Sequence, residues 1–192
     1  MRSMAFAAPL FMLAYGVLRW IDGVDGRHHQ GSIAWNAGHL AFLASMVTFV
    51  LLAIALYRRA TLGRRVGLVA AAVAVLGSGC MIWVIVGDLS RSFAVHHPLP
   101  VALGTIGPIG FVLGLIGLLS LQVAAGRPPV WSPMLFFAGY TAITINLDLL
   151  PLAALLILGA TWPLVSVARV TRLAARPETV HSASLRNFRK IG

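Results

Sequence analysis

The chain has 192 residues, of which 59% are hydrophobic and only 10% are charged, whereas a soluble globular domain carries about 25% charged residues. Its 15 Lys and Arg against 5 Asp and Glu give a formal net charge of +10, but these charges lie in short segments between apolar runs. A nucleic-acid-binding protein would gather them on one water-facing surface, so we expect no nucleic acid and predict contact with anionic lipid headgroups instead.

Six apolar stretches approach the length of about 20 residues that a membrane-spanning helix needs. They are residues 3–20, 32–57, 66–87, 99–125, 131–146 and 149–168. We therefore predict an all-α fold, a polytopic transmembrane helical bundle of about six spans in the cell membrane. A cleaved signal peptide is the rival interpretation of the first stretch, but no convincing small-residue cleavage site follows it.

The charges between the stretches predict the orientation, because loops rich in Lys and Arg stay in the cytoplasm. With the N-terminus in the cytoplasm, twelve of the fifteen basic residues fall on the cytoplasmic side. Four of the five acidic residues fall on the outer side, namely Asp22, Asp25, Asp88 and Asp148. This asymmetry supports an even number of spans with both termini cytoplasmic. Residues 169–192 then form a basic, partly disordered cytoplasmic tail next to anionic headgroups.

The second stretch contains a histidine inside the predicted span. Asn36 and His39 are three residues apart, so they share one face of a helix. An ionisable residue within a span is by default a functional candidate. The other interpretation is a histidine near the interface that is hydrogen-bonded to a neighbouring helix.

The third and fourth stretches carry packing signals. Cys80 lies among apolar and small residues in the third, and as the only cysteine it excludes an intrachain disulfide. Glycines recur every three or four residues in the fourth, at Gly104, Gly107, Gly110, Gly114 and Gly117. We predict that this helix packs centrally, and the step from Gly110 to Gly114 offers a contact for a homo- or hetero-oligomer. Pro108 predicts a kink that is either structural or opens a cavity.

The fifth stretch has polar residues spaced four apart. Tyr140, Thr144 and Asp148 would line one stripe of its outer half, with Asn146 nearby. If the turn begins early, Asp148 is a water-facing turn residue instead, and Pro151 begins the last helix. Both interpretations stay open.

The outer side gathers further carboxylate and imidazole groups, at Asp22, Asp25, His28, His29, His96 and His97. These are ligands for a divalent metal and acid or base groups for proton transfer. They are also what a short solvated loop contains. Haem is a minor alternative, with His39 and either His96 or His97 as axial ligands. Against it, His96 and His97 precede two prolines in what we expect to be a loop.

Together these features predict a small-molecule, metal or proton-linked site in the outer half of the bundle, in a membrane-embedded enzyme or a transporter. The candidate catalytic residues are His39, Asp88 and Asp148, and the candidate binding residues are Asn36, Tyr140, Thr144 and Asn146. The alternative is a non-catalytic membrane protein that uses the glycine-rich helix and the basic tail for assembly. No nucleophile elbow, P-loop, Rossmann glycine pattern or zincin motif is present.

Overall fold

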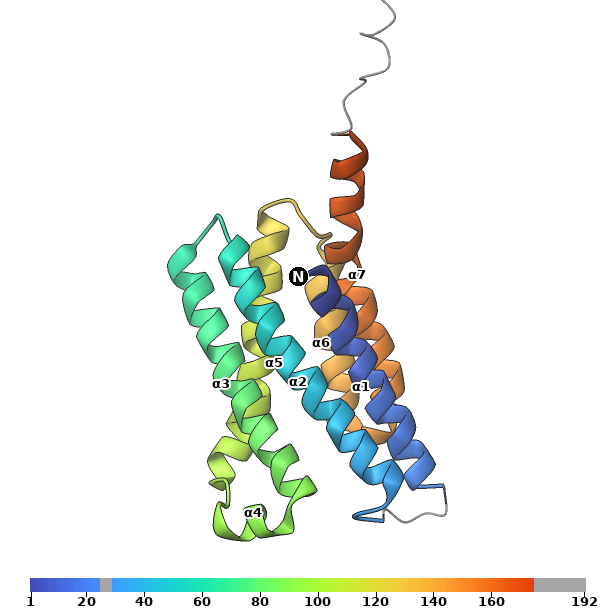
Figure 1. The fold of residues 1–192 in the computed structure, drawn as a ribbon. Helices are drawn as coiled ribbons and strands as arrows, with labels where there is room; N and C mark the ends of the chain where they lie inside the picture. Colours follow the sequence, from blue (N-terminus) through green and yellow to red (C-terminus); the bar gives the residue numbers. More distant parts are fainter. Residues whose placement is uncertain (25–28, 175–192) are drawn as a thin grey trace, which may run out of the picture.

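The computed structural model describes residues 1–24 and 29–174, and these residues form helices joined by short connections. The elements are α1 (Arg2–Asp22), α2 (Ile33–Arg59), α3 (Arg64–Leu89), α4 (Arg91–His96), α5 (Val101–Ala124), α6 (Trp131–Ile145), the short 3-10 helix η1 (Leu147–Leu149) and α7 (Leu150–Ala174). The long helices run up and down side by side (Figure 1). The prediction of an all-α bundle is confirmed.

Five segments of the described chain are long and apolar enough to cross a membrane: α1, α2, α3, α5 and the stretch Leu147–Val165. The sequence predicts a sixth crossing at α6, but this helix has 15 residues. At a rise of about 1.5 Å per residue it is about 22 Å long, against a hydrocarbon core of about 30 Å. The count of six therefore stays a prediction.

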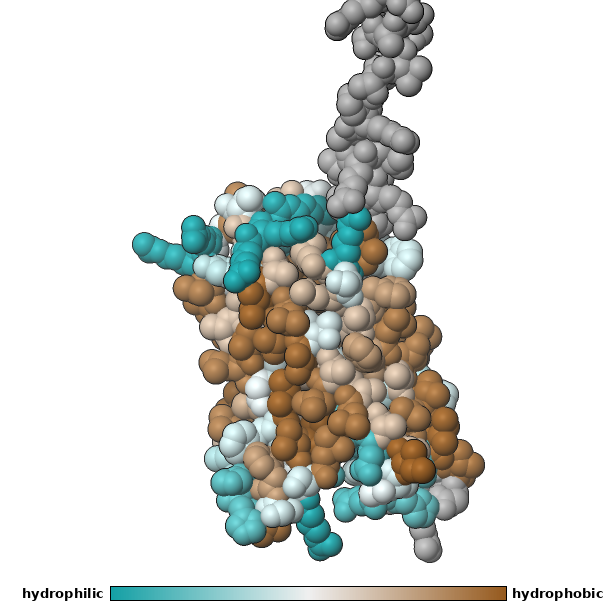
Figure 2. Space-filling model, viewed as in Figure 1, coloured by the Kyte–Doolittle hydropathy of each residue, from teal (hydrophilic) through white to brown (hydrophobic). Residues whose placement is uncertain are grey.

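The sides of the bundle are covered by apolar side chains that no other part of the described chain buries. Leu76 is 71% exposed, Leu113 60% and Phe137 56%. Figure 2 shows, on one face of the molecule, a broad apolar band between two more polar ends. A water-soluble monomer rarely leaves so much contiguous apolar surface uncovered, whereas lipid covers it without cost.

The connections at the two ends of the bundle (Figure 1) differ in charge, because most of the described arginines lie at one end and the described aspartates at the other. One end, here the basic end, has the α2–α3 and α5–α6 connections, with Arg58, Arg59, Arg64, Arg65 and Arg127. The other, here the acidic end, has the α1–α2 connection, α4 and η1, with Asp22, Asp88 and Asp148. The N-terminus and the described end of α7 both lie toward the basic end.

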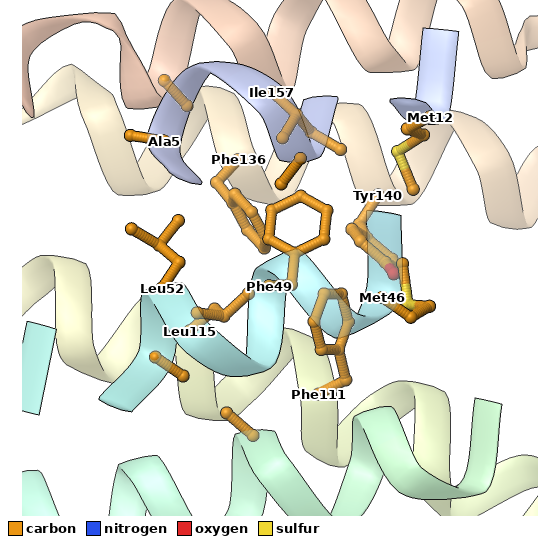
Figure 3. Close-up of a cluster of buried hydrophobic side chains, with 14 of the residues drawn as sticks. Ala5, Met12, Met46, Phe49, Leu52, Phe111, Leu115, Phe136, Tyr140 and Ile157 are labelled. Carbon is orange, nitrogen blue, oxygen red and sulfur yellow. The ribbon is translucent and has the colours of Figure 1, made fainter. Parts of the chain in front are cut away.

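Aromatic rings join the helices at the centre of the bundle (Figure 3). Phe49 of α2 lies edge-on to Phe111 of α5 and Phe136 of α6, with ring centroids 5.4 and 6.2 Å apart. All three are at most 1% exposed. Because α2 also packs on α1 and α3, this cluster connects the helices at the two sides of the bundle.

The glycines of α5 let it approach α3 closely within the same chain. A Cβ added at Gly114 would lie 2.5 Å from both the carbonyl oxygen of Ala70 and the backbone nitrogen of Ala74. At Gly77 of α3, an added Cβ would overlap the backbone of Phe111 and Gly107. The glycine-rich helix α5 therefore packs closely, as predicted, and its partner is α3 of the same chain.

One connection departs from the sequence expectation. The segment before the fourth span, expected to be a loop, contains the helix α4, which includes His96. Ser90 begins it, because its hydroxyl accepts a hydrogen bond from the backbone N–H of Phe93 at 3.3 Å. Pro98 and Pro100 follow His97, which ends the helix, and Pro100 caps the start of α5.

Candidate functional site

The turn between α1 and α2 positions the first residues of α2. Ser32 is the N-cap of α2, and its Oγ accepts a hydrogen bond from the backbone N–H of Trp35 at 3.0 Å. The same hydroxyl donates to Oδ1 of Asp22 at 2.6 Å, while Oδ2 of Asp22 accepts from the backbone N–H of His29 at 3.0 Å. The Asp22 carboxylate thus stabilises this turn and sets the direction in which α2 leaves it.

His39 lies inside the bundle among aromatic rings. It is 4% exposed, and its ring centroid is 4.2 Å from that of Trp35 and 5.3 Å from that of Tyr15 on α1. Tyr15 also stacks on Phe42 of α2 at 4.6 Å. These contacts hold the imidazole in one orientation, so that its two nitrogens face defined partners.

The two ring nitrogens of His39 face different oxygens. Nδ1 lies 2.9 Å from the backbone oxygen of Trp35, and because a carbonyl oxygen only accepts, Nδ1 is the donor. Nε2 then faces Oδ2 of Asp88 on α3 at 3.6 Å. With a hydrogen on Nδ1, Nε2 and the carboxylate attract each other only if one of them also carries a proton. The buried imidazole of α2 and the carboxylate of α3 thus lie within ion-pair distance of each other.

Asp88 also lies on the wall of a cavity at the acidic end, here called the mouth cavity, which has a volume of about 460 Å³. Its lining includes Asp88 and Val84 of α3 and Arg91 of α4. Trp83 and Phe93 contribute aromatic walls, with ring centroids 5.1 Å apart. The cavity is thus partly apolar and carries charged groups of both signs.

A second cavity of about 140 Å³, here called the inner cavity, lies deeper between α2, α3 and α5. Cys80 and Pro108 are on its wall, together with Gly104. Since Pro108 has no N–H, the Gly104 carbonyl loses its usual helical donor on this wall. Val84 and Asp88, one turn apart on α3, line both cavities. These two side chains therefore form the boundary between the mouth and inner cavities.

The other candidate binding residues lie apart from this pair. Asn36 is exposed, and its Nδ2 donates to the backbone oxygen of Gly31 at 3.3 Å. Tyr140 and Thr144 line a separate apolar cavity of about 200 Å³ between α5 and α6. Within it, the Thr144 hydroxyl donates to the Tyr140 carbonyl at 2.8 Å.

Asp148 has the position of a turn residue. It is exposed within η1, and its backbone N–H donates to Oδ1 of Asn146 at 2.8 Å. Its carbonyl oxygen accepts from Nε1 of Trp20 at 2.8 Å, which joins the end of α1 to this turn. Of the two interpretations of Asp148, the geometry agrees with the water-facing turn.

The predicted metal ligands do not come together in the part of the chain that the structure describes. No group of three or more His, Cys, Asp or Glu side chains lies close enough there to hold a metal ion. Nδ1 of His96 is engaged with the Ser92 carbonyl at 2.8 Å, and the His97 ring packs on Phe93 at 5.3 Å. Asp25 and His28 lie outside the described residues.

Two groups of aromatic residues at the site were missed by sequence reasoning. Tyr15 and Phe42 support His39, while Trp83 and Phe93 form walls of the mouth cavity. In the sequence each is one aromatic residue in or beside an apolar stretch, which is ordinary for a membrane helix. Only the packing of α1 and α4 against their neighbours shows which of them face the site.

The chain matches no family model, no curated protein and no solved structure. Its class therefore rests on the fold and the site. It is a helical bundle with apolar helices of membrane-crossing length, and at its acidic end an imidazole and a carboxylate lie beside two cavities.

Proposed function

We propose that this chain is a multi-pass protein of the cell membrane that binds a small molecule at its acidic end, in a transport or reaction step linked to a proton. The observation that carries this proposal is the position of Asp88. Its carboxylate lines both cavities and lies 3.6 Å from the buried imidazole of His39. A solute that moves between the cavities would pass a carboxylate that lies beside an imidazole, and both are side chains that can take up or release a proton.

The proposal includes six crossings, with the acidic end outside and both termini in the cytoplasm. The separation of charge supports this orientation, because arginine-rich connections resist translocation. The opposite orientation would place the four arginines at the α2–α3 connection outside the membrane. The sixth crossing rests on α6, which runs between the two ends beside α7.

The native cysteine provides a test, because Cys80 lies on the wall of the inner cavity. A small, charged methanethiosulfonate reagent applied from outside should modify Cys80, since water in the cavity supports the reactive thiolate. The matched control is the double variant Cys80→Ser, Gly79→Cys. A Cβ at Gly79 meets no atom within 4 Å, so the new thiol would face lipid and should stay unmodified.

Equal modification rates for the two thiols, or no modification of Cys80 from either side, would overturn the proposed route. Modification of Cys80 from the cytoplasmic side alone would overturn the orientation and leave the cavity in place. Replacing Val84 by Trp should slow the reaction at Cys80, because Val84 lines both cavities.

The remaining sequence hypotheses find less support in the described residues. The described residues bring together no group of three or more metal-binding side chains, and the proposed haem partners of His39 are engaged elsewhere, His96 with the Ser92 carbonyl and His97 with the Phe93 ring. The glycine-rich face, predicted to serve partner contacts, packs on α3 of the same chain. We therefore carry only the small-molecule site forward.

A further inference from the structure

The mouth cavity has two groups of opposite charge that are not paired with each other. Asp88 and Arg91 both line it, and in a continuous helix residues three apart are neighbours that attract. Here Ser90 stands between them with extended backbone angles, φ −136° and ψ 99°. It ends α3 and begins α4, so the two side chains enter the cavity from different helices.

The described chain gives these two charged groups different partners. The carboxylate of Asp88 has His39 within ion-pair distance, at 3.6 Å, and its side chain is 43% exposed. Arg91 is exposed and forms no hydrogen bond or ion pair within the described residues. A ligand could therefore pair with Arg91 without displacing a partner, and it could reach the exposed part of the Asp88 carboxylate beside His39.

The walls between these charges suit an apolar group. Trp83 is held by a hydrogen bond from its Nε1 to the His97 carbonyl at 2.9 Å, and its ring packs on Phe93 at 5.1 Å. Val84 is a further apolar side chain of this wall, and it also lines the inner cavity. The site thus offers an anionic group, a cationic group and an apolar surface around a volume of about 460 Å³.

We propose that the ligand of the mouth cavity is a zwitterion, a molecule with an ammonium group beside Asp88 and an oxyanion beside Arg91. This inference rests on the proposed function and names its ligand class. Two sources carry this chemistry, a free apolar amino acid and the phosphoethanolamine headgroup of a lipid. An amine alone or an acid alone would leave one charged wall of the cavity unpaired, which costs binding energy.

Three probes of one shape test this directly by calorimetric titration of the purified full-length protein in detergent. They are L-leucine, isopentylamine, which lacks the carboxylate, and 4-methylpentanoate, which lacks the amine. A charge-assisted hydrogen bond contributes about 1.5–3 kcal/mol, so leucine should bind with a Kd about tenfold or more below that of either relative.

Variants then assign the two charges. Arg91→Gln should remove the preference for leucine over isopentylamine, and Arg91→Lys should restore part of it. Asp88→Asn should remove the preference over 4-methylpentanoate. Arg65→Gln, the same change at the basic end, should keep both preferences. If Arg91→Gln keeps the full preference for leucine over isopentylamine, Arg91 does not bind the oxyanion. This conclusion holds even if the other variants fail to fold.

A separate experiment tests whether the ligand is a lipid headgroup. In nanodiscs, phosphatidylethanolamine should raise the unfolding temperature above that in phosphatidylglycerol, and Arg91→Gln should cancel the difference, if the headgroup is the ligand. Binding of leucine without this lipid effect assigns the free solute. If neither source is preferred over its singly charged relative, the zwitterion is overturned. Access of reagent to Cys80 would still decide the proposed function separately.

Discussion

At the scale of single residues, a proline in α1 depends on a threonine in α7. Pro9 has no N–H, so it cannot donate to the carbonyl of Ala5 one turn earlier. The hydroxyl of Thr161 lies 2.7 Å from that oxygen and supplies the donor, and both residues are buried. In lipid no water is present to take its place.

We expect Thr161→Val, which keeps the shape of the side chain, to lower the free energy of unfolding by about 1 kcal/mol. In a Pro9→Ala background the same change should cost clearly less, because the new N–H at position 9 satisfies the Ala5 carbonyl. A double-mutant cycle by reversible unfolding in mixed micelles measures the coupling. Equal costs in the two backgrounds would show that Thr161 acts through its contacts within α7 instead.

The same scale shows where sequence reasoning stops. His39 could be named from the sequence because an ionisable residue inside an apolar stretch is rare and costly, and Asp88 because it falls among the Asp and His residues of the outer side. That they face each other depends on the rotation of α2 against α3, which no local pattern encodes. For Asp148, spacing alone left two interpretations, and the early start of η1 agrees with the turn.

At the scale of elements, the contact between α3 and α5 depends on the absence of side chains at a few positions. Gly77→Ala and Gly114→Ala each place a Cβ against backbone atoms of the other helix. Since backbone cannot rotate away, the helices must separate, and we expect a loss of about 1–3 kcal/mol in the free energy of unfolding for each.

Gly79→Ala and Gly104→Ala are the matched controls on the same two helices, because an added Cβ meets nothing within 4 Å at either position. Alanine favours a helix over glycine by about 1 kcal/mol, so these variants should be as stable as the parent or more so. The measurement is the midpoint of unfolding in detergent for all four. If the two control variants lose as much stability as Gly77→Ala and Gly114→Ala, the close contact between α3 and α5 is not where the structure places it.

The elements also differ in how well the sequence predicted them. The predicted stretches agree within two residues with the bounds of α1, α2, α3, α5 and α6, whereas α7 continues six residues beyond the predicted end at residue 168. The helix α4 was missed because it has six residues, too few for a hydrophobic period to appear. It matters for the site, since it carries Arg91 and Phe93 into the mouth cavity.

At the scale of the whole molecule, the open question is whether α6 crosses the membrane. Val130 and Leu147 flank α6, and they are 68% and 46% exposed. In a Cys80→Ser background, Leu147→Cys should react with an impermeant maleimide on intact cells. Val130→Cys should react only after permeabilisation. Labelling of both from the same side would reduce the count to five and move one terminus outside.

The arrangement of charge at this scale was the most predictable feature, because it depends on composition between stretches and not on packing. The sequence alone separated the arginine-rich connections from the aspartates, and the fold places them at opposite ends. The cavities could not be predicted in the same way. Their walls come from α2, α3, α4 and α5, so they depend on how several elements pack against one another.

The short length of α6 also concerns the lipid around the protein. A helix of 15 residues is about 8 Å shorter than a hydrocarbon layer of about 30 Å, so a bilayer that α6 crosses, as we propose, would become thinner at its exposed face. Each ångström of such mismatch costs a fraction of a kcal/mol. The protein would therefore be more stable in bilayers of short-chain lipids than of long-chain ones, and membrane thickness itself would become a variable that tunes the α5–α6 side of the bundle.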